Sequence, residues 1–169
     1  FVKEWIDFTK EHPNLTIEVR TKSGDLSFFK ENAAVKNVIY AFTISPDLVV
    51  QKYEHNTASM ESRIKAASYA KSLGHNIRLC FDPMIYVPDW KRHYEDMIDR
   101  CFACIDKDSL LDVSVGSFRI SQDYLKKMRR DMPESSVAQF PYVNKGGVYQ
   151  YPEGLMQEME DFMEKKLLE

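Results

Sequence analysis

The sequence predicts an α/β protein in which about four mostly parallel strands carry helices on their outer side. Segments rich in β-branched and aromatic residues alternate with segments whose apolar residues recur at helical spacing, which is typical of β–α–β units. The alternation runs along the whole chain, without a low-complexity tract or an interdomain linker. We therefore expect residues 1–169 to form a single domain, equal to about half of a (β/α) barrel or to a small open sheet.

The first half of the chain supplies three strands and the helices that connect them. Phe1–His12 spaces its apolar residues among charges in the manner of an amphipathic helix. Pro46 favours a first helical turn, Ser59 is a good N-cap, and Gly74 suits a left-handed C-cap. The elements expected next are a strand Leu15–Thr21, a short helix or turn Gly24–Asn32, a strand Val35–Thr43, helices Asp47–Tyr53 and Met60–Leu73, and a strand Asn76–Phe81 that stops at Asp82–Pro83.

The second half of the chain supplies the fourth strand and a helical C-terminus. Gly146–Gly147 indicates a tight turn, because glycine adopts positive φ angles without steric cost. The expected elements are a helix Trp90–Ile105, a strand Leu111–Phe118, a short basic helix Ser121–Asp131, a loop or hairpin Phe140–Tyr151, and an amphipathic helix from about Pro152.

Composition narrows the class of protein and its compartment. The net charge of −3 and the pI of about 5.9 argue against a nucleic-acid binder held by charge alone, and they leave room for a local basic groove. No apolar run has the length of a membrane span, so we expect no membrane partner. Cys80, Cys101 and Cys104 form no disulfide framework, which favours a reducing cytoplasm. The last two are more typical of a helical core than of a zinc site.

The beginning of the chain and its number of strands predict an incomplete barrel. The sequence opens inside an amphipathic helix and without Met, so we expect a fragment that starts within a longer protein. Half a barrel leaves the edge of a parallel strand uncovered. We expect a loop, a terminal helix or a second copy of the chain to cover that edge, and the last case would be self-association.

Short motifs follow one another in an ordered series from about Arg20 to the final helix. They are RTK (Arg20–Lys22), FTIS (Phe42–Ser45), Tyr53–Glu54 with Thr57, Arg63–Ile64 with Ala66–Ala67, Gly74, Pro83 with Ile85–Tyr86, Trp90, GSFR (Gly116–Arg119), and Gly147 with Tyr151–Pro152. No single motif is specific, whereas the ordered series is fairly specific. In this series the chain resembles the C-terminal half of spore photoproduct lyase-like proteins, a family of the radical S-adenosylmethionine superfamily.

The resemblance implies the C-terminal half of a partial TIM-type barrel. In the family, a C-x3-C-x2-C loop holds a [4Fe–4S] cluster that cleaves S-adenosylmethionine to a 5′-deoxyadenosyl radical, and the namesake enzymes thereby reverse thymine-dimer lesions in DNA. This sequence has no such loop, since Cys101 and Cys104 are its only close pair. We expect the cluster-binding half to lie outside the chain, which alone should be inactive and bind S-adenosylmethionine weakly or not at all.

Three residues at strand ends are assigned to cofactor binding by the resemblance. Lys22 matches a lysine, and Thr43 a serine, that contact S-adenosylmethionine in the family. Asp82 stands where the family has a small residue, so its carboxylate would hold a ribose hydroxyl or cap a turn. Without the resemblance, Lys22 would be a solvated lysine and Thr43 a β-branched residue favoured by its strand.

Two further groups of polar residues are candidates for function. Gln150–Tyr151 match an Arg-Tyr pair that the family uses at the DNA lesion; Tyr151 keeps an aromatic ring for base stacking, whereas Gln150 lacks the charge. Glu54, His55 and Arg63 form a cluster around a helix start. This cluster either braces the loops of the site or, as we favour, is a Glu–Arg pair beside a solvated histidine.

Three hypotheses of function stay open. The first is the C-terminal cofactor and substrate wall of a spore photoproduct lyase-like radical enzyme that acts on DNA carrying a pyrimidine photoproduct. The second is a related radical enzyme with a non-DNA substrate, an alternative that Gln150 and the acidic pI keep open. The third is a non-catalytic α/β binding module that has lost the cluster. A C-x3-C-x2-C loop upstream of Phe1 would support both enzymes, and its absence would exclude both.

Overall fold

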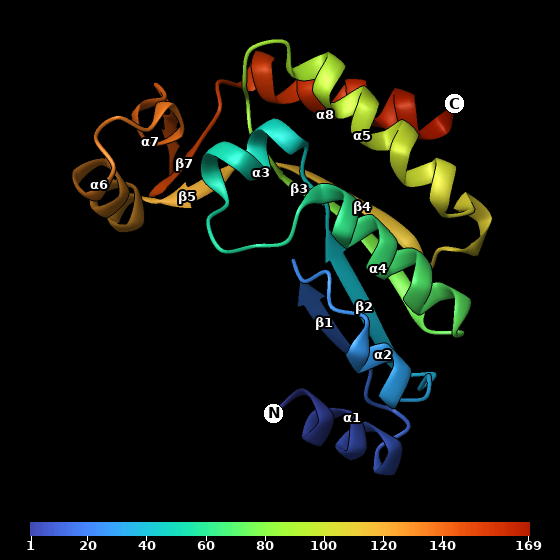
Figure 1. Cartoon of the computed structure of the whole chain (residues 1–169). Coiled ribbons are helices and arrows are strands. Elements are labelled where there is room, and N and C mark those ends of the chain that lie inside the picture. Colours follow the sequence, from blue (N-terminus) through green and yellow to red (C-terminus); the bar gives the residue numbers. More distant parts are fainter. The chain divides into compact units, whose positions relative to one another are not determined.

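The computed structural model describes residues 1–169 and confirms the α/β fold class (Figure 1). Its elements are α1 (Val2–Glu11), β1 (Ile17–Thr21), α2 (Ser27–Glu31), β2 (Val38–Thr43), α3 (Asp47–Tyr53), α4 (Met60–Ser72), β3 (Asn76–Met84), α5 (Trp90–Cys104), the 3-10 turn η1 (Lys107–Ser109), β4 (Asp112–Ser117), β5 (Arg119–Ser121), α6 (Gln122–Asp131), α7 (Ser136–Gln139), β6 (Val143–Lys145), β7 (Val148–Gln150) and α8 (Glu153–Leu168). No helix is both long and apolar enough to cross a lipid bilayer.

The main sheet has four strands in the order β1-β2-β3-β4. Strands β1 and β2 are parallel, with Ile17 beside Val38, and β2 and β3 are parallel, with Tyr40 beside Ile77. Spatial order equals chain order, as expected when each strand is followed by a helix and a return to the next parallel position. The strand edge at β1 carries no further strand in this sheet.

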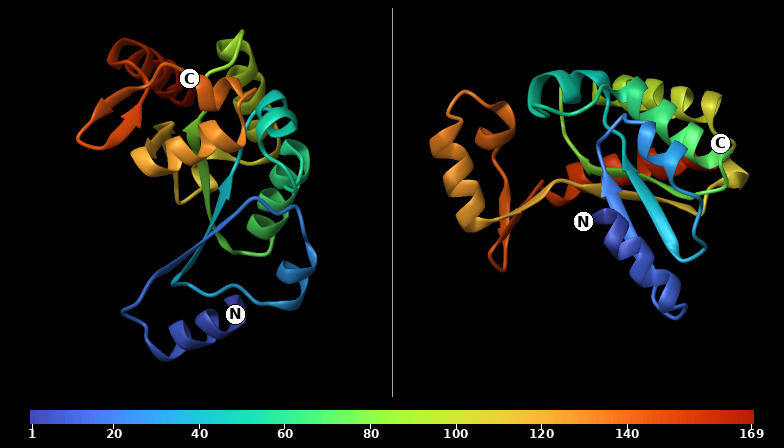
Figure 2. Two further views of the ribbon diagram at one scale, coloured as in Figure 1. Left: turned by 90° about the vertical axis from the view of Figure 1, so that its left-hand side faces the viewer. Right: turned by 60° about the horizontal axis from the view of Figure 1, so that its bottom comes forward.

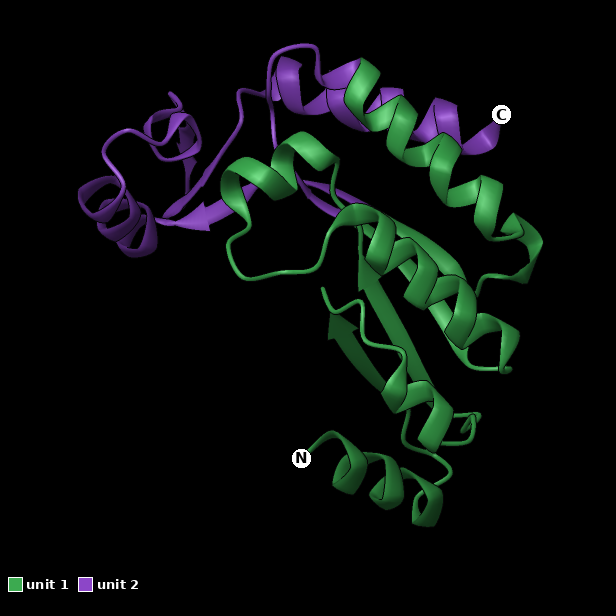
Figure 3. Cartoon of the chain, in the orientation of Figure 1, with its two compact units in different colours: residues 1–81, 92–114 green, residues 82–91, 115–169 purple.

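The chain divides into two compact units, shown in Figure 3. Unit 1 comprises residues 1–81 and 92–114, and unit 2 comprises residues 82–91 and 115–169. The boundary falls within strands β3 and β4 and near the start of α5. The expected single domain over residues 1–169 stays a prediction, because compactness alone does not show whether the units unfold together.

Unit 1 buries one face of its strands beneath helices. Helices α2 and α4 lie on the same side of β1 and β2 in both views of Figure 2. Tyr40 and Phe42 of β2 and Ile64 of α4 are nearly inaccessible to solvent. The Ser59 hydroxyl accepts a hydrogen bond from the Ser62 backbone N–H, which confirms the expected N-cap of α4. Gly74 has the positive φ expected of a left-handed residue after this helix.

Unit 2 contains a small antiparallel sheet that the sequence pattern did not predict as a whole. Its strand order is β5-β7-β6. The hairpin between β6 and β7 turns at Gly146–Gly147, both with positive φ, as the pattern predicted. Strand β5 and helix α7 were not predicted; with three and four residues, they are too short to show a hydrophobic period. Helix α8 buries Met159 and Met163.

The predicted end of strand β3 is wrong, and so is the predicted start of β2 at Val35, since that strand begins at Val38. Strand β3 does not stop before Asp82–Pro83 but continues to Met84. The Met84 carbonyl accepts a hydrogen bond from the Phe118 N–H at 3.2 Å, so the backbone keeps a partner beyond the proline. Proline removes only its own donor, and a strand continues where that donor is not needed by a neighbour.

Candidate functional site

Lys22 and Thr43 stand at the carboxyl ends of neighbouring parallel strands. Thr43 is the last residue of β2, and Lys22 directly follows β1. The parallel register pairs Thr21 with Phe42, so one further step along both strands places Lys22 beside Thr43. Adjacent strands lie about 4.8 Å apart, and paired positions share one face of the sheet. The structure thus brings these two sequence-predicted residues together within unit 1.

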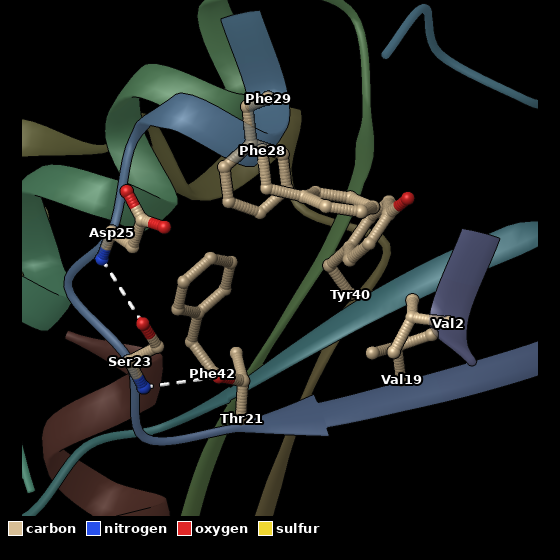
Figure 4. Close-up of a pocket in the computed structure, with 9 residues that line it drawn as sticks. All are labelled: Val2, Val19, Thr21, Ser23, Asp25, Phe28, Phe29, Tyr40 and Phe42. Carbon is tan, nitrogen blue, oxygen red and sulfur yellow. Dashed lines mark hydrogen bonds between the residues drawn. The ribbon is translucent and has the colours of Figure 1, made fainter. Parts of the chain in front are cut away.

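The opposite face of β1 and β2 is apolar and holds a pocket of about 160 Å³ (Figure 4). The rings of Phe42 and Tyr40 lie along this pocket, and Thr21 stands at its lower edge in the view. Because successive side chains point to opposite faces of a strand, Lys22 and Thr43 belong to the other face. The pocket is therefore separate from the candidate site, and its aromatic lining is suited to packing.

A carboxylate links Lys22 to the interior of unit 1. Glu54 Oε1 accepts from Lys22 Nζ at 2.7 Å and from Ser45 Oγ at 2.8 Å. Glu54 Oε2 accepts from Arg63 Nη2 at 2.5 Å. The exposed fraction falls inward, from 35% for the Lys22 side chain to 10% for Glu54 and 0% for Arg63. We call these four residues the strand-end ion cluster.

Arg63 is the buried anchor of the strand-end ion cluster. Besides Glu54, its guanidinium donates to the Ala58 carbonyl at 2.8 Å, to the Thr43 carbonyl at 3.1 Å and to Thr57 Oγ1 at 2.7 Å. A buried charge is tolerated only when it is paired and hydrogen-bonded, and Arg63 meets both conditions. The same side chain therefore fixes the end of β2 and the carboxylate that holds Lys22.

The electrostatics of the cluster keep Glu54 ionised. Burial acts to raise the pKa of Glu54, but hydrogen bonds from Lys22, Arg63 and Ser45 outweigh it and hold the pKa below the ordinary value of 4.5. At neutral pH the cluster thus contains two cations and one anion. Lys22 uses one of its ammonium donors on Glu54, and its partial exposure leaves donor capacity for an anionic ligand.

The sequence interpretation of Glu54, His55 and Arg63 was correct in part. The Glu–Arg pair exists, and His55 is exposed to solvent as expected. The pair is not a surface contact, however, since it is buried and extends to Lys22 and Ser45. Ser45 lies within the FTIS motif, so the motif contained a signal for it.

In unit 2, Gln150 lines a polar cleft of about 390 Å³ with Arg119, Lys145 and Glu160 among its neighbours. The antiparallel register places Arg119 of β5 directly opposite Gln150 of β7. Paired side chains in such a ladder stand on one face with their Cβ atoms about 5 Å apart. The guanidinium of Arg119 therefore lies beside Gln150, and it gives the cleft a positive charge that Gln150 itself does not carry. Whether Gln150 binds a substrate stays a prediction.

Tyr151 is part of an aromatic cluster inside unit 2. Its ring centroid lies 4.9 Å from that of Phe140 and 5.3 Å from that of Tyr142. Its Oη accepts a hydrogen bond from the Tyr86 backbone N–H at 2.8 Å, and the residue is 1% exposed. The packing gives the ring an interior position instead of the surface position that base stacking requires. A role of Tyr151 at a substrate stays a prediction.

Asp82 lies within β3, in unit 2, and is half-buried. It does not cap a turn, because the strand continues past it. A Cβ atom added to Gly116 of β4 would stand 3.5 Å from the Asp82 Cβ, so the two residues are neighbours. The cofactor role of Asp82 stays a prediction.

The cysteines do not provide a cluster-binding set. Cys80 and Cys101 are buried and Cys104 is exposed, so the expected position in a helical core is confirmed for Cys101 and is wrong for Cys104. Burial raises the pKa of the Cys101 thiol to about 12, which opposes the thiolate form that binds iron. No group of three or more His, Cys, Asp or Glu residues is arranged to hold a metal ion. The residues of this chain therefore do not fit a [4Fe–4S] cluster.

Comparison with protein families gives a match along almost the whole chain. A family model described as spore photoproduct lyase matches residues 1–165. The chain belongs to the spore photoproduct lyase family. Among curated proteins, the spore photoproduct lyase of Clostridium acetobutylicum is 23% identical over 172 residues, which cover 95% of this chain and 50% of that protein.

Solved structures of spore photoproduct lyase share the fold. A mutant with bound AdoMet and dinucleoside spore photoproduct matches with a TM-score of 0.73 at 18% identity, over 90% of this chain and 47% of that chain. A complex with dinucleoside spore photoproduct matches with a TM-score of 0.72 at 18% identity and the same coverage. The chain thus spans about half the length of the relatives in the spore photoproduct lyase family that it matches.

Proposed function

We propose that this chain forms the cofactor and substrate wall of a radical S-adenosylmethionine enzyme that reverses a thymine photoproduct in DNA. The observation that carries the proposal is that Lys22 and Thr43 each lie one step beyond the paired residues Thr21 and Phe42 at adjacent strand ends, in a chain of the spore photoproduct lyase family. In parallel α/β folds this edge of the sheet is where ligands bind. Solved relatives bind AdoMet and the dinucleoside photoproduct, which supports the same ligand classes here.

Lys22 and Thr43 are assigned to the cofactor. The ammonium of Lys22, a side chain that is 35% exposed, would pair with the carboxylate of S-adenosylmethionine, and the Thr43 hydroxyl would donate or accept a hydrogen bond beside it. When bound to its cluster, the cofactor supplies a 5′-deoxyadenosyl radical. The cluster ligands would come from outside residues 1–169, since the cysteines of this chain do not fit them.

The polar cleft of unit 2 is assigned to the substrate. Gln150 offers both a donor and an acceptor, and Arg119 opposite it offers a charged donor fork. Such a set is suited to the carbonyl groups of a thymine photoproduct and to the phosphate of its strand. Asp82 is assigned to the cofactor, where its carboxylate would accept a hydrogen bond from a ribose hydroxyl. We also place the protein in a reducing cytoplasm, where the cofactor chemistry and three free cysteines are compatible.

The test uses the natural full-length protein, reconstituted with iron and sulfide under reducing and anaerobic conditions. Incubation with S-adenosylmethionine and dinucleoside spore photoproduct should convert the lesion to two thymidine residues. If S-adenosylmethionine is cleaved but the lesion does not change, the hypothesis of a DNA substrate is excluded and the radical enzyme with a non-DNA substrate is favoured. If an iron-loaded preparation does not cleave the cofactor, both enzyme hypotheses are excluded.

A further inference from the structure

We propose that Glu54 is a positioning residue that directs the Lys22 ammonium toward the carboxylate of an S-adenosyl ligand. The inference rests on the proposed function, because it assumes that Lys22 contacts that ligand. The Glu54 carboxylate is itself largely covered from solvent, so it would act on the ligand through Lys22. Its experiment separates loss of orientation from loss of the proposed function.

Glu54 restricts the position of the Lys22 ammonium. Lysine has a flexible stem and three equivalent donors, so a free ammonium at a strand end samples many positions. The 2.7 Å contact with Glu54 Oε1 restricts Lys22 Nζ to one of them. The side chain nevertheless stays 35% exposed. Glu54 therefore holds the ammonium without enclosing it, which is what a residue that presents a donor to a ligand must do.

Glu54 has little freedom of its own. Ser45 Oγ and Arg63 Nη2 donate to its two oxygens, at 2.8 and 2.5 Å. Arg63 is in turn fixed by the Ala58 and Thr43 carbonyls. Lys22 is thus attached through the largely covered Glu54 and the buried Arg63 to the backbone of the strand that carries Thr43. The two proposed cofactor contacts are held in one rigid frame.

The charge of the strand-end ion cluster distinguishes two opposite effects of removing Glu54 on the affinity for a carboxylate ligand. With two cations and one anion, the cluster carries a net charge of about +1. Removal of the Glu54 charge would raise that to about +2 and, if only Coulomb attraction mattered, would tighten the binding of a carboxylate. A glutamine also cannot accept from both cations through both of its terminal atoms, since one of them is a donor. Orientation would be lost, and binding would weaken.

The experiment measures the affinities of two ligands by calorimetry, using the reconstituted natural full-length protein. S-adenosylhomocysteine has the amino-acid carboxylate, and 5′-methylthioadenosine lacks it. Glu54→Gln should weaken S-adenosylhomocysteine binding about five- to tenfold, the loss expected when one charge-assisted hydrogen bond is misdirected. Binding of 5′-methylthioadenosine should change less than about twofold, within the scatter expected of a neutral surface substitution.

A double-mutant cycle identifies Lys22 as the residue through which Glu54 acts. Lys22→Met alone should weaken S-adenosylhomocysteine at least as much as Glu54→Gln. Addition of Glu54→Gln to Lys22→Met should then cause little further loss, because residues in one chain of contacts are not additive. Glu61→Gln is the matched control: Glu61 lies in the first turn of α4, is 59% exposed and pairs with Lys65, and its loss should affect neither ligand.

Glu54→Asp provides a second variant if Glu54→Gln unfolds, since it keeps the charge for Arg63 but shortens the reach toward Lys22. Glu54→Asp should also weaken the binding of S-adenosylhomocysteine and leave the binding of 5′-methylthioadenosine nearly unchanged. Tighter binding of S-adenosylhomocysteine, equal weakening of both ligands, or no change would each overturn the positioning role while the proposed function stands. Failure of the unaltered, iron-loaded protein to bind either ligand would overturn the proposed function, and the positioning role with it.

Discussion

The two units hold their candidate residues by different physical means. In unit 1, Lys22 and Thr43 are fixed by charged hydrogen bonds that converge on Glu54 and Arg63. In unit 2, Tyr151 is fixed by the rings of Phe140 and Tyr142, which pack against it at centroid distances of about 5 Å. The ion cluster of unit 1 is stable only if every charge is paired, whereas the aromatic cluster of unit 2 depends on how well its rings fit together.

This difference has consequences for stability. A buried ion pair contributes little as a whole, but loss of one partner is costly because the other charge stays buried. An aromatic cluster loses stability in proportion to the area and contacts removed. Unit 1 should therefore respond to single changes of charge and to pH, whereas unit 2 should respond to changes of volume and hydrogen bonding within its rings.

The largest effect is expected for Arg63→Met. This change leaves the Glu54 carboxylate without its buried partner and frees the Thr43 and Ala58 carbonyls. The free energy of unfolding should fall by about 3–5 kcal/mol, as measured by urea denaturation.

Arg130→Met is the control for this change, because the Arg130 side chain is 75% exposed and pairs with its neighbour Asp131. Its effect should stay within about 0.5 kcal/mol. A loss below about 1 kcal/mol for Arg63→Met would mean that the strand-end ion cluster does not depend on its buried anchor.

A smaller effect is expected for Tyr151→Phe. The ring and its packing are kept, but the Tyr86 N–H loses the oxygen to which it donates at 2.8 Å. The free energy of unfolding should fall by about 0.5–1.5 kcal/mol, the usual net contribution of one hydrogen bond, because Tyr86 itself is 38% exposed. Trp90 lies in unit 2 and Trp5 in unit 1, so fluorescence in a Trp5→Phe background reports on unit 2.

Tyr124→Phe is the matched control, since Tyr124 is 71% exposed and should lose nothing measurable. If both tyrosine variants had the same stability, the hydroxyl of Tyr151 would not be part of what holds unit 2 together.

A third prediction concerns pH and Glu54. Its pKa is lowered in the folded state, so its contribution to stability is present above the ordinary value of 4.5 and is lost as the pH falls through the lower folded value. The difference in unfolding free energy between the unaltered chain and Glu54→Gln should therefore be largest near neutral pH and narrow below 4.5. Urea denaturation at several pH values measures this difference.

The corresponding difference for Tyr151→Phe should not change over the same range, because the rings around Tyr151 carry no carboxylate or imidazole. A constant difference for Glu54→Gln would contradict the charged state assigned to the cluster.

Much of unit 1 was predictable from the sequence because its signals are local. The strands carry β-branched and aromatic residues, and Ser59 and Gly74 act through the backbone next to them. The proximity of Lys22 and Thr43 follows from parallel strands whose carboxyl ends meet at one edge. Cofactor ligands were assigned only through the resemblance, since a strand-end lysine has no local mark of function.

The parts that the sequence did not predict depend on contacts between distant residues. The Lys22–Glu54 contact spans 32 positions, and its burial comes from Arg63, whose environment no local pattern reveals. Tyr151 follows a glycine turn that is typical of an exposed hairpin, yet Phe140 and Tyr142 enclose it. Strand β3 passes a proline because its next carbonyl finds a partner at Phe118. Each case is decided by tertiary packing, which overrides local propensity.

The smallest effect is expected for Glu153→Gln, which removes the ion pair with Lys145 beside the hairpin of unit 2. The two side chains are 75% and 53% exposed, so solvent screens them and the loss should be at most about 1 kcal/mol. About 0.5 M salt should reduce it further, since the screening length is then only a few ångströms. Urea midpoints at low and high salt measure both quantities. A loss well above 1 kcal/mol that did not depend on salt would show that charge also holds unit 2, and the contrast with the buried cluster of unit 1 would disappear.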